Sequence, residues 1–125
     1  MFNRVCLIIL SLWAVNCAAY DASYYHRHPA ALQDAMKQCP DSPPKGFTCV
    51  ELQMITQQTN ALAFELQTDP QQFGQKILAL QEAIAKVELQ LEAKPNDASL
   101  TTFLNQSNEQ LLERLVIVKW LESPN

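Results

Sequence analysis

Glycine and histidine are both scarce in this chain of 125 residues, which has two of each. Glycine-dependent phosphate loops and tight β-hairpins need backbone conformations that other residues avoid, so the composition disfavours both. Histidine is the usual base or ligand in nucleophilic and metal-assisted catalysis. Because His26 and His28 fall in one short segment, the chain offers little material for an active site.

An excess of positive charge is also missing. The chain has nine Lys and Arg residues against thirteen Asp and Glu residues, a formal net charge of −4. Proteins that bind nucleic acids neutralise phosphates with basic side chains, and proteins that dock on anionic lipid carry basic clusters. The sequence therefore predicts neither nucleic acid binding nor electrostatic attachment to a membrane.

No set of side chains is arranged in the sequence as a catalytic or metal site requires. A nucleophilic triad needs a hydroxyl or thiol, a base and an orienting acid. His26 and His28 could offer two imidazoles to a metal, but no third ligand follows at helical spacing. Glu82, Glu88 and Glu92 fall on one stretch of expected helix, where carboxylates are usually solvent-exposed. We expect a protein that is not an enzyme, with no catalytic residue, metal or cofactor.

Long hydrophobic runs are limited to the start of the chain. Residues 5–15 are almost entirely apolar, roughly 11 residues, whereas a membrane-spanning helix needs ~20. Arg4 precedes this run, and small residues follow it up to Ala19. A positive start, a short apolar core and a small-residue end are typical of a secretory signal peptide. We expect residues 1–19 to be cleaved after Ala19; if they are not, they would anchor the chain in a membrane.

A third outcome depends on Cys17. Lipoproteins carry a cysteine just after the apolar run, where the thiol takes a diacylglyceryl group that tethers the protein to a membrane. Asn16, directly before Cys17, fits such a signal poorly. The chain is expected to be exported to the periplasm or the envelope, or secreted. It would contact a membrane only if Cys17 is lipidated or the signal is retained.

Removal of residues 1–19 leaves about 106 residues, enough for one small domain, and two cysteines, Cys39 and Cys49. In an oxidising compartment two cysteines ten residues apart should pair. The residues between them are rich in proline, so this stretch can bend back but cannot form a helix. Two free buried thiols, or half of a metal site, are the alternatives.

Helical spacing dominates the rest of the chain. Pro29 suits the first turn of a helix because it lacks a backbone donor. Apolar residues then recur at spacings of three and four, as on one helix face; they are Leu32, Ala35, Met36 and Cys39. Thr48 and Glu51 have the form of a capping box, which starts a second helix.

The two cysteines fall at the ends of these expected helices. Cys39 would end the first helix, and Cys49 would lie in the first turn of the second. The second helix runs to about residue 67, and its apolar face consists of Leu52, Ile55, Thr59, Leu62, Ala63 and Leu66. The sequence therefore predicts a module at residues 20–68 in which a disulfide staples a helix–loop–helix corner.

Residues 69–125 predict a long antiparallel αα-hairpin. Asp69 and Pro70 provide a cap and a first helical residue, and Asn96 or Asp97 can cap the next helix. Each helix has ~24 residues and so is roughly 36 Å long. Equal helices joined by a short turn lie antiparallel. The expected seams are Phe73, Ile77, Leu80, Ile84, Val87 and Leu91 on the first helix, and Leu100, Leu104, Ser107, Leu111, Leu115 and Val118 on the second.

A second apolar face lies outside these seams. It consists of Leu78, Phe103, Leu112, Val116 and Trp120. Either the N-terminal helices cover this face and complete a small bundle, or part of it stays open for a partner or a second copy. The expected fold class is all-α: a small helical bundle with a disulfide-stapled helix–loop–helix followed by a long antiparallel αα-hairpin, in one compact unit.

One motif goes beyond general helical spacing. It reads Tyr-Tyr-x-x-His-Pro-x-x-Leu-x-x-Ala-x-x-x-Cys from residue 24, with a second cysteine at Cys49, and includes Tyr24, Tyr25, His28, Pro29, Leu32 and Cys39. Across residues 24–50 the chain resembles the EexN family of entry-exclusion lipoproteins. The resemblance implies that the tyrosines pack on the start of the helix, that His28 caps it and that the cysteines staple the corner.

The same resemblance implies a function. Members of the family are envelope proteins of conjugative or type IV secretion systems, where they block uptake of DNA from an equivalent donor. We expect a non-enzymatic exported envelope protein that acts by protein–protein contact, in entry exclusion or in an accessory role. Its partner would be a protein of the envelope, or a second copy through the hairpin. The alternatives are a secreted host-interacting factor and a periplasmic metal-binding or hydrolytic protein.

Overall fold

The computed structural model describes residues 21–123, and five helices account for most of this range. They are α2 (Ala22–Arg27), α3 (Pro29–Lys37), α4 (Cys49–Thr68), α5 (Pro70–Ala93) and α6 (Ala98–Glu122). No strand occurs between residues 21 and 123, and the predicted all-α class is confirmed. The expected signal peptide at residues 1–19, including Cys17, lies outside the described residues.

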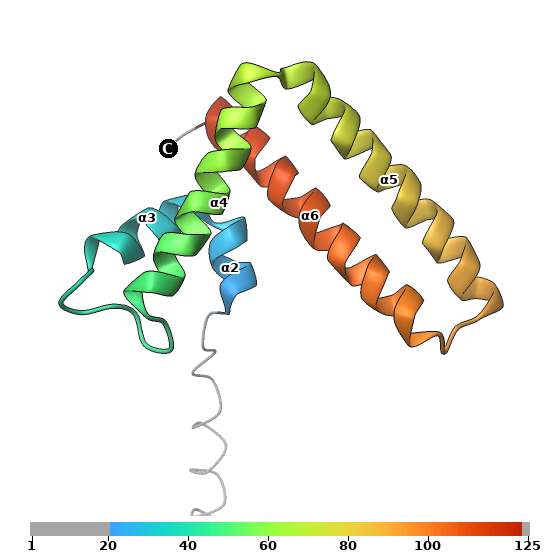
Figure 1. Cartoon of the computed structure of the whole chain (residues 1–125), viewed down its shortest axis with the longest axis horizontal. Coiled ribbons are helices and arrows are strands. Elements are labelled where there is room, and N and C mark those ends of the chain that lie inside the picture. The colour runs from blue at the N-terminus through green and yellow to red at the C-terminus, as the bar shows by residue number, and fades with distance from the viewer. Residues whose placement is uncertain (1–20, 124–125) are drawn as a thin grey trace, which may run out of the picture.

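The helices form two arms that meet at an angle (Figure 1). In one arm, α2 and α3 pack beside the first half of α4; the other arm is the antiparallel hairpin of α5 and α6. The arms join where the end of α4 meets the start of α5 and the last turns of α6. The predicted hairpin is confirmed, and the N-terminal helices cover only the end of it that lies at this joint.

The long helices begin at side chains that accept hydrogen bonds from free backbone donors. The predicted capping box is confirmed: Glu51 N donates to Thr48 Oγ1 over 3.2 Å, and Thr48 N donates to Glu51 Oε2 over 2.7 Å. The Asp69 carboxylate caps α5, with Pro70 as the first helical residue. A cap of this kind stabilises a helix by about 1 kcal/mol. These local signals set where α4 and α5 start.

Two further caps refine the expectations. Asp97, rather than Asn96, caps α6, because its carboxylate accepts from Ser99 N over 3.0 Å. Asp21 caps the short helix α2 by accepting from Tyr24 N over 3.0 Å. Helix α2 was not expected, because six residues are too few to show a helical apolar period.

The N-terminal arm has its own small core beneath the disulfide. Cys39 and Cys49 lie at disulfide distance with their Cα atoms 5.8 Å apart, so the predicted staple between α3 and α4 is confirmed. The ring of Phe47, from the connecting loop, meets the ring of Tyr25 edge-on at a centroid distance of 4.9 Å. The buried members of this core are Tyr25, Leu32, Ala35, Leu52 and Ile55. The loop is therefore held at both ends, covalently by the disulfide and by packing at Phe47.

The α5 seam is buried mainly at two points. Phe73, at the joint, is 1% exposed and Val87 is also buried. The other predicted seam residues are half-buried: Ile77, Leu80, Ile84 and Leu91. Two helices alone cannot surround each other's apolar faces, so the seam stays partly open where no third helix covers it.

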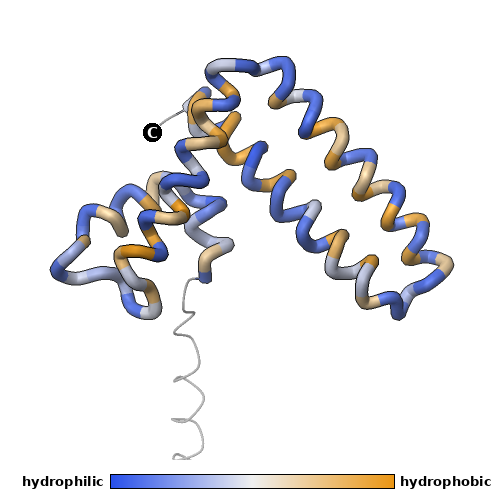
Figure 2. Tube along the Cα trace, viewed as in Figure 1, coloured by the Kyte–Doolittle hydropathy of each residue, from blue (hydrophilic) through white to orange (hydrophobic). Residues whose placement is uncertain are grey.

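The predicted α6 seam is wrong in its last turns. Leu115, expected on the seam, is 43% exposed, whereas Ile117, which was not expected there, is 1% exposed. This part of α6 contacts α2 and α4 as well as α5. Hydrophobic residues are frequent along the end of α6 that lies where the two arms join (Figure 2). The buried face of α6 therefore turns towards the N-terminal arm. The prediction assumed that α6 packs against α5 alone, so it did not include this turn.

The residues expected to form a second apolar face of the hairpin are only partly covered. Val116 and Trp120 are half-buried near the joint. Leu78, Phe103 and Leu112 remain exposed. Of the two arrangements that the sequence left open, the structure has the one in which part of this face is accessible.

Replacing both Cys39 and Cys49 by serine should lower the free energy of unfolding by roughly 2–3 kcal/mol, because the staple closes a loop in the unfolded chain. Urea unfolding followed by circular dichroism measures this change. A reductant should move the parent protein to the midpoint of the variant and leave the variant unaffected. Equal midpoints for parent and variant without reductant would contradict the stapling role.

Candidate functional site

The motif residues meet at the corner between α2 and α3. The rings of Tyr24 and His28 are stacked, with centroids 4.1 Å apart and planes 20° from parallel. His28 is the N-cap residue of α3, but its side chain makes no cap hydrogen bond to that helix. Instead, His28 Nδ1 lies 2.7 Å from the carbonyl oxygen of Tyr24. His28 is thus at the expected cap position and accepts from Leu32 N through its backbone carbonyl over 3.0 Å, while its imidazole contacts the preceding helix.

A groove of about 340 Å³ lies beside this corner, between α3, α4 and the last turns of α6. Pro29, Leu32 and Met36 lie three and four residues apart, so they share the face of α3 that lines the groove. Trp120 lines it from α6. The sequence singled out Pro29 and Leu32, and the structure places both in this groove.

The remaining wall of the groove comes from α4. Thr56 and Thr59 line it, and Thr56 Oγ1 donates to the carbonyl oxygen of Leu52 over 2.8 Å. The Thr56 hydroxyl is therefore already satisfied within its own helix. Gln33 and Lys37 supply polar groups from α3. An apolar pocket with a few polar groups is the usual form of a site that takes an apolar ligand or side chain.

An ion-pair cluster joins the two arms. Lys76 Nζ lies 2.7 Å from Glu65 Oε1, and Arg114 Nη1 lies 3.4 Å from the same oxygen. The Arg114 guanidinium also lies over the Phe73 ring, 4.8 Å from its centroid. The hydrogen bond from Lys76, supported by Arg114, lowers the pKa of Glu65 against the opposing effect of burial. One arginine of α6 thus contacts an acid of α4 and an aromatic ring of α5.

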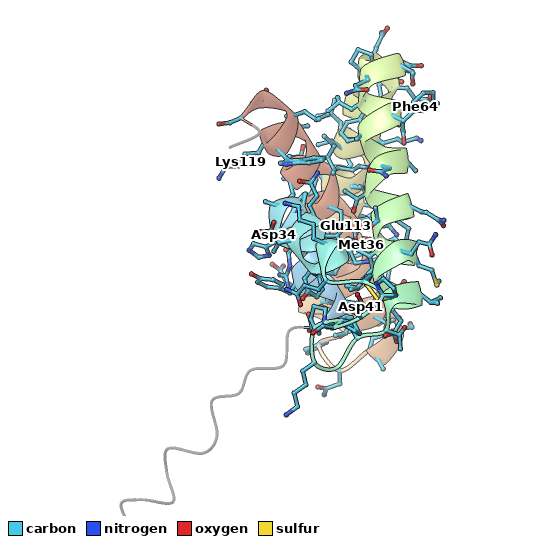
Figure 3. The ribbon with its side chains drawn as sticks, turned by 90° about the vertical axis from the view of Figure 1, so that its left-hand side faces the viewer. Asp34, Met36, Asp41, Phe64, Glu113 and Lys119 are labelled. Atoms are coloured by element: carbon cyan, nitrogen blue, oxygen red, sulfur yellow. A yellow bond between two sulfur atoms is a disulfide. The ribbon has the colours of Figure 1, made fainter. Side chains whose placement is uncertain are left out.

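A polar cleft of about 450 Å³ lies between α2, α4 and α6. His26 Nδ1 lies 3.6 Å from Glu113 Oε1 across it, and Glu65 also lines it. Glu113 is labelled near the middle of the side view (Figure 3). Burial raises the pKa of Glu113, and the nearby Glu109 adds to this, while His26 and Arg114 oppose it. The cleft joins α2 to α6 through this pair.

Both histidines have partners in the structure. His28 is bonded to a backbone carbonyl and His26 faces Glu113. Within residues 21–123, no three His, Cys, Asp or Glu side chains are grouped so that they could hold a metal ion. Glu82, Glu88 and Glu92 are exposed on α5. The groove between α3, α4 and α6 brings the motif residues Pro29 and Leu32 together with Met36 and Trp120.

Arg114 is the main site residue that the sequence reasoning missed, and the sequence did contain a signal for it. Positions 100, 104, 107, 111, 114 and 118 keep a strict alternation of four and three. A seam that includes the apolar Leu115 in place of Arg114 departs from this alternation. The guanidinium occupies the seam position by stacking on Phe73.

Comparisons of the chain with protein-family models, with curated proteins and with solved structures find no match. Among the helices described, none is both long enough and apolar enough to cross a membrane. The function must therefore be argued from the groove and from the residues that line it.

Replacing Arg114 by Lys should lower the free energy of unfolding by about 1 kcal/mol, because lysine keeps the charge but lacks the planar group that stacks on Phe73. Urea unfolding measures the change. The control is Lys76→Arg, which keeps the charge at the more exposed partner of Glu65 and should change stability little. If Arg114→Lys is as stable as the parent, the charge of residue 114 is sufficient and stacking on Phe73 adds no stability.

Replacing Glu113 by Gln should change how stability depends on pH. The pKa of Glu113 is raised in the folded state, so this carboxyl stabilises the fold below its ordinary pKa of 4.5, and that stabilisation is lost as the pH rises through the folded value. The variant should gain stability relative to the parent over this range, which urea unfolding at a series of pH values measures.

Glu65→Gln is the matched comparison, with the opposite sign. The pKa of Glu65 is lowered, so its stabilisation is present above its ordinary pKa of 4.5 and is lost as the pH falls through the folded value. This variant should be less stable than the parent at neutral pH, and the difference should shrink in acid. If the free energy of unfolding changes with pH in the same way for the parent and Glu113→Gln above pH ~4.5, the pKa of Glu113 is not raised in the folded protein.

Proposed function

We propose that this chain is a non-enzymatic exported protein of the cell envelope that acts by binding another protein. Its setting would be a conjugative or type IV secretion system, in entry exclusion or in an accessory role. The observation that carries this proposal is that Pro29 and Leu32, two residues of the motif that resembles the entry-exclusion family, line the groove with Met36 and Trp120.

The form of the groove supports a protein partner. Its volume of about 340 Å³ suits one or two apolar side chains. Methionine adapts to differently shaped partners, and tryptophan is enriched among the residues that dominate binding energy. The partner would insert an apolar side chain against Met36 and Trp120, while Gln33 and Lys37 contact its backbone or polar groups.

The disulfide between two walls of the groove supports the same proposal. The disulfide links the end of α3 to the start of α4, and these two helices form two walls of the groove. A wall that is already fixed loses less conformational freedom when a partner binds. The bonded positions of His28 and His26 likewise favour binding over catalysis, since both imidazoles already have structural partners.

Production of the chain in recipient cells should lower the frequency of DNA transfer from donors with an equivalent conjugative system. Met36→Glu, which places a charge in the groove, should abolish this effect, whereas Met36→Leu should retain it. Leu78→Glu is the matched control, because it adds the same charge at an exposed residue of α5, which does not line the groove. The readout is the number of transconjugants per recipient.

Two checks make this experiment decisive. Urea unfolding must give Met36→Glu a folded population equal to that of the parent, or the variant is replaced by Met36→Gln. Fractionation must find the chain in the envelope. Unchanged transfer with abundant folded envelope protein would overturn the entry-exclusion role, and protein found in the culture medium without an envelope pool would favour a secreted host-interacting factor.

A further inference from the structure

Helix α4 carries a second face, opposite the one that packs in the core, on which four of five positions are apolar. Its positions follow spacings of four, three, four and three, and they are Val50, Met54, Gln57, Ala61 and Phe64. They span an arc of about 80° around the helix. Val50, Met54 and Phe64 are 66%, 56% and 67% exposed. We call these five residues the α4 stripe.

The α4 stripe is open to a large partner. Helix α4 forms one edge of the molecule in the side view, and Phe64 lies on its outer side (Figure 3). The core contacts of α4 come from Leu52, Ile55 and Thr59, which are buried on the other side of the helix. A second helix can therefore lie along the stripe without displacing any core contact.

We propose that the stripe pairs two copies of this chain through antiparallel α4 helices related by a two-fold axis. Alternating spacings of four and three form the seam of a two-helix coiled coil. In one antiparallel register, Met54 faces Phe64 of the second copy and Ala61 faces Gln57 of the second copy, each contact occurring twice. Methionine sulfur against an aromatic ring is a favourable contact, and the small Ala61 lets the helices approach closely.

One edge of the stripe is self-complementary in hydrogen bonding. It consists of the amides Gln53, Asn60 and Gln67. In the same register, Gln53 faces Gln67 of the second copy, and Asn60 faces Asn60 of the second copy at the axis. An amide both donates and accepts, so two identical amide edges can bond to each other.

The other edge carries charges that are already compensated within each copy. It carries Glu51 at one end and Glu65 at the other, which brings Glu51 of one copy beside Glu65 of the second copy. Two cations, Lys76 and Arg114, already share the Glu65 carboxylate. Glu113 also interacts with Arg114, so the two cations balance the two carboxylates and Glu65 does not face Glu51 as an isolated charge.

The hairpin offers a poorer surface for a second copy, although the sequence had suggested it. Its exposed apolar residues do not form one stripe. Phe103 and Leu112 are nine residues apart and so lie about 180° apart around α6. Leu78 and Leu89 belong to α5. Among the helices that the structure describes, α4 combines a regular seam with a self-complementary amide edge. Asn60 of this edge also lines the groove, so a second copy and a groove partner would meet at this residue.

Sedimentation equilibrium on the full chain, over a series of concentrations, tests the pairing. The weight-average mass should rise from that of one chain to that of two. Phe64→Glu should hold the protein at the mass of one chain, because it places a charge in the seam. Leu89→Glu is the control, since Leu89 is as exposed as Phe64 but lies on α5, and it should leave the rise unchanged.

Cross-linking with a short bismaleimide tests the register. Asn60→Cys should give a covalent dimer, because position 60 faces itself across the axis, whereas Gln67→Cys should give none. One mass at all concentrations, or a dimer that survives Phe64→Glu, would overturn the proposal. Dimer loss in Leu89→Glu alone would assign the contact to the hairpin, and cross-linking only at position 67 would overturn the register.

Discussion

The arrangement of the two arms depends on one side chain, that of Arg114. It lies over Phe73 of α5 and pairs with Glu65 of α4, so it holds three helices at one point. The core of the N-terminal arm contains buried residues of α2, α3 and α4 only. Without Arg114, the main buried residues at the joint between the arms would be Ile117 and Phe73. We expect the angle between the arms to be less firmly fixed in that case.

The features that the sequence predicted correctly are local ones. A capping box spans four residues, as at Thr48 and Glu51, and its two partners recognise each other wherever the helix lies. The corner between Cys39 and Cys49 is similarly confined to a short loop. The end of α6 could not be predicted in this way. Its buried face depends on three neighbouring helices. Arg114 was not expected on this face because a charged side chain is usually exposed.

The groove shows the same division between local and distant information. The motif pointed to Pro29 and Leu32, but not to the cavity, because the third wall comes from Trp120 near the other end of the chain. His28 was predicted to matter at this corner, yet the hydrogen bond of its imidazole runs back to Tyr24 rather than forward into α3. A motif can therefore identify residues that lie together without giving the partner of each one.

The composition of α4 reflects its three surfaces, which are the core face, the joint with the hairpin and the α4 stripe. Its two charged residues are Glu51 and Glu65; the first belongs to the capping box and the second to the joint. Everything else on the helix is apolar, an amide or a hydroxyl. The exposed face of α5 in the same chain carries Glu82, Lys86, Glu88 and Glu92, as expected for a helix that faces water. A helix face of equal exposure that lacks such charges is better suited to another protein surface than to solvent, and for α4 the matching surface can be α4 of a second copy.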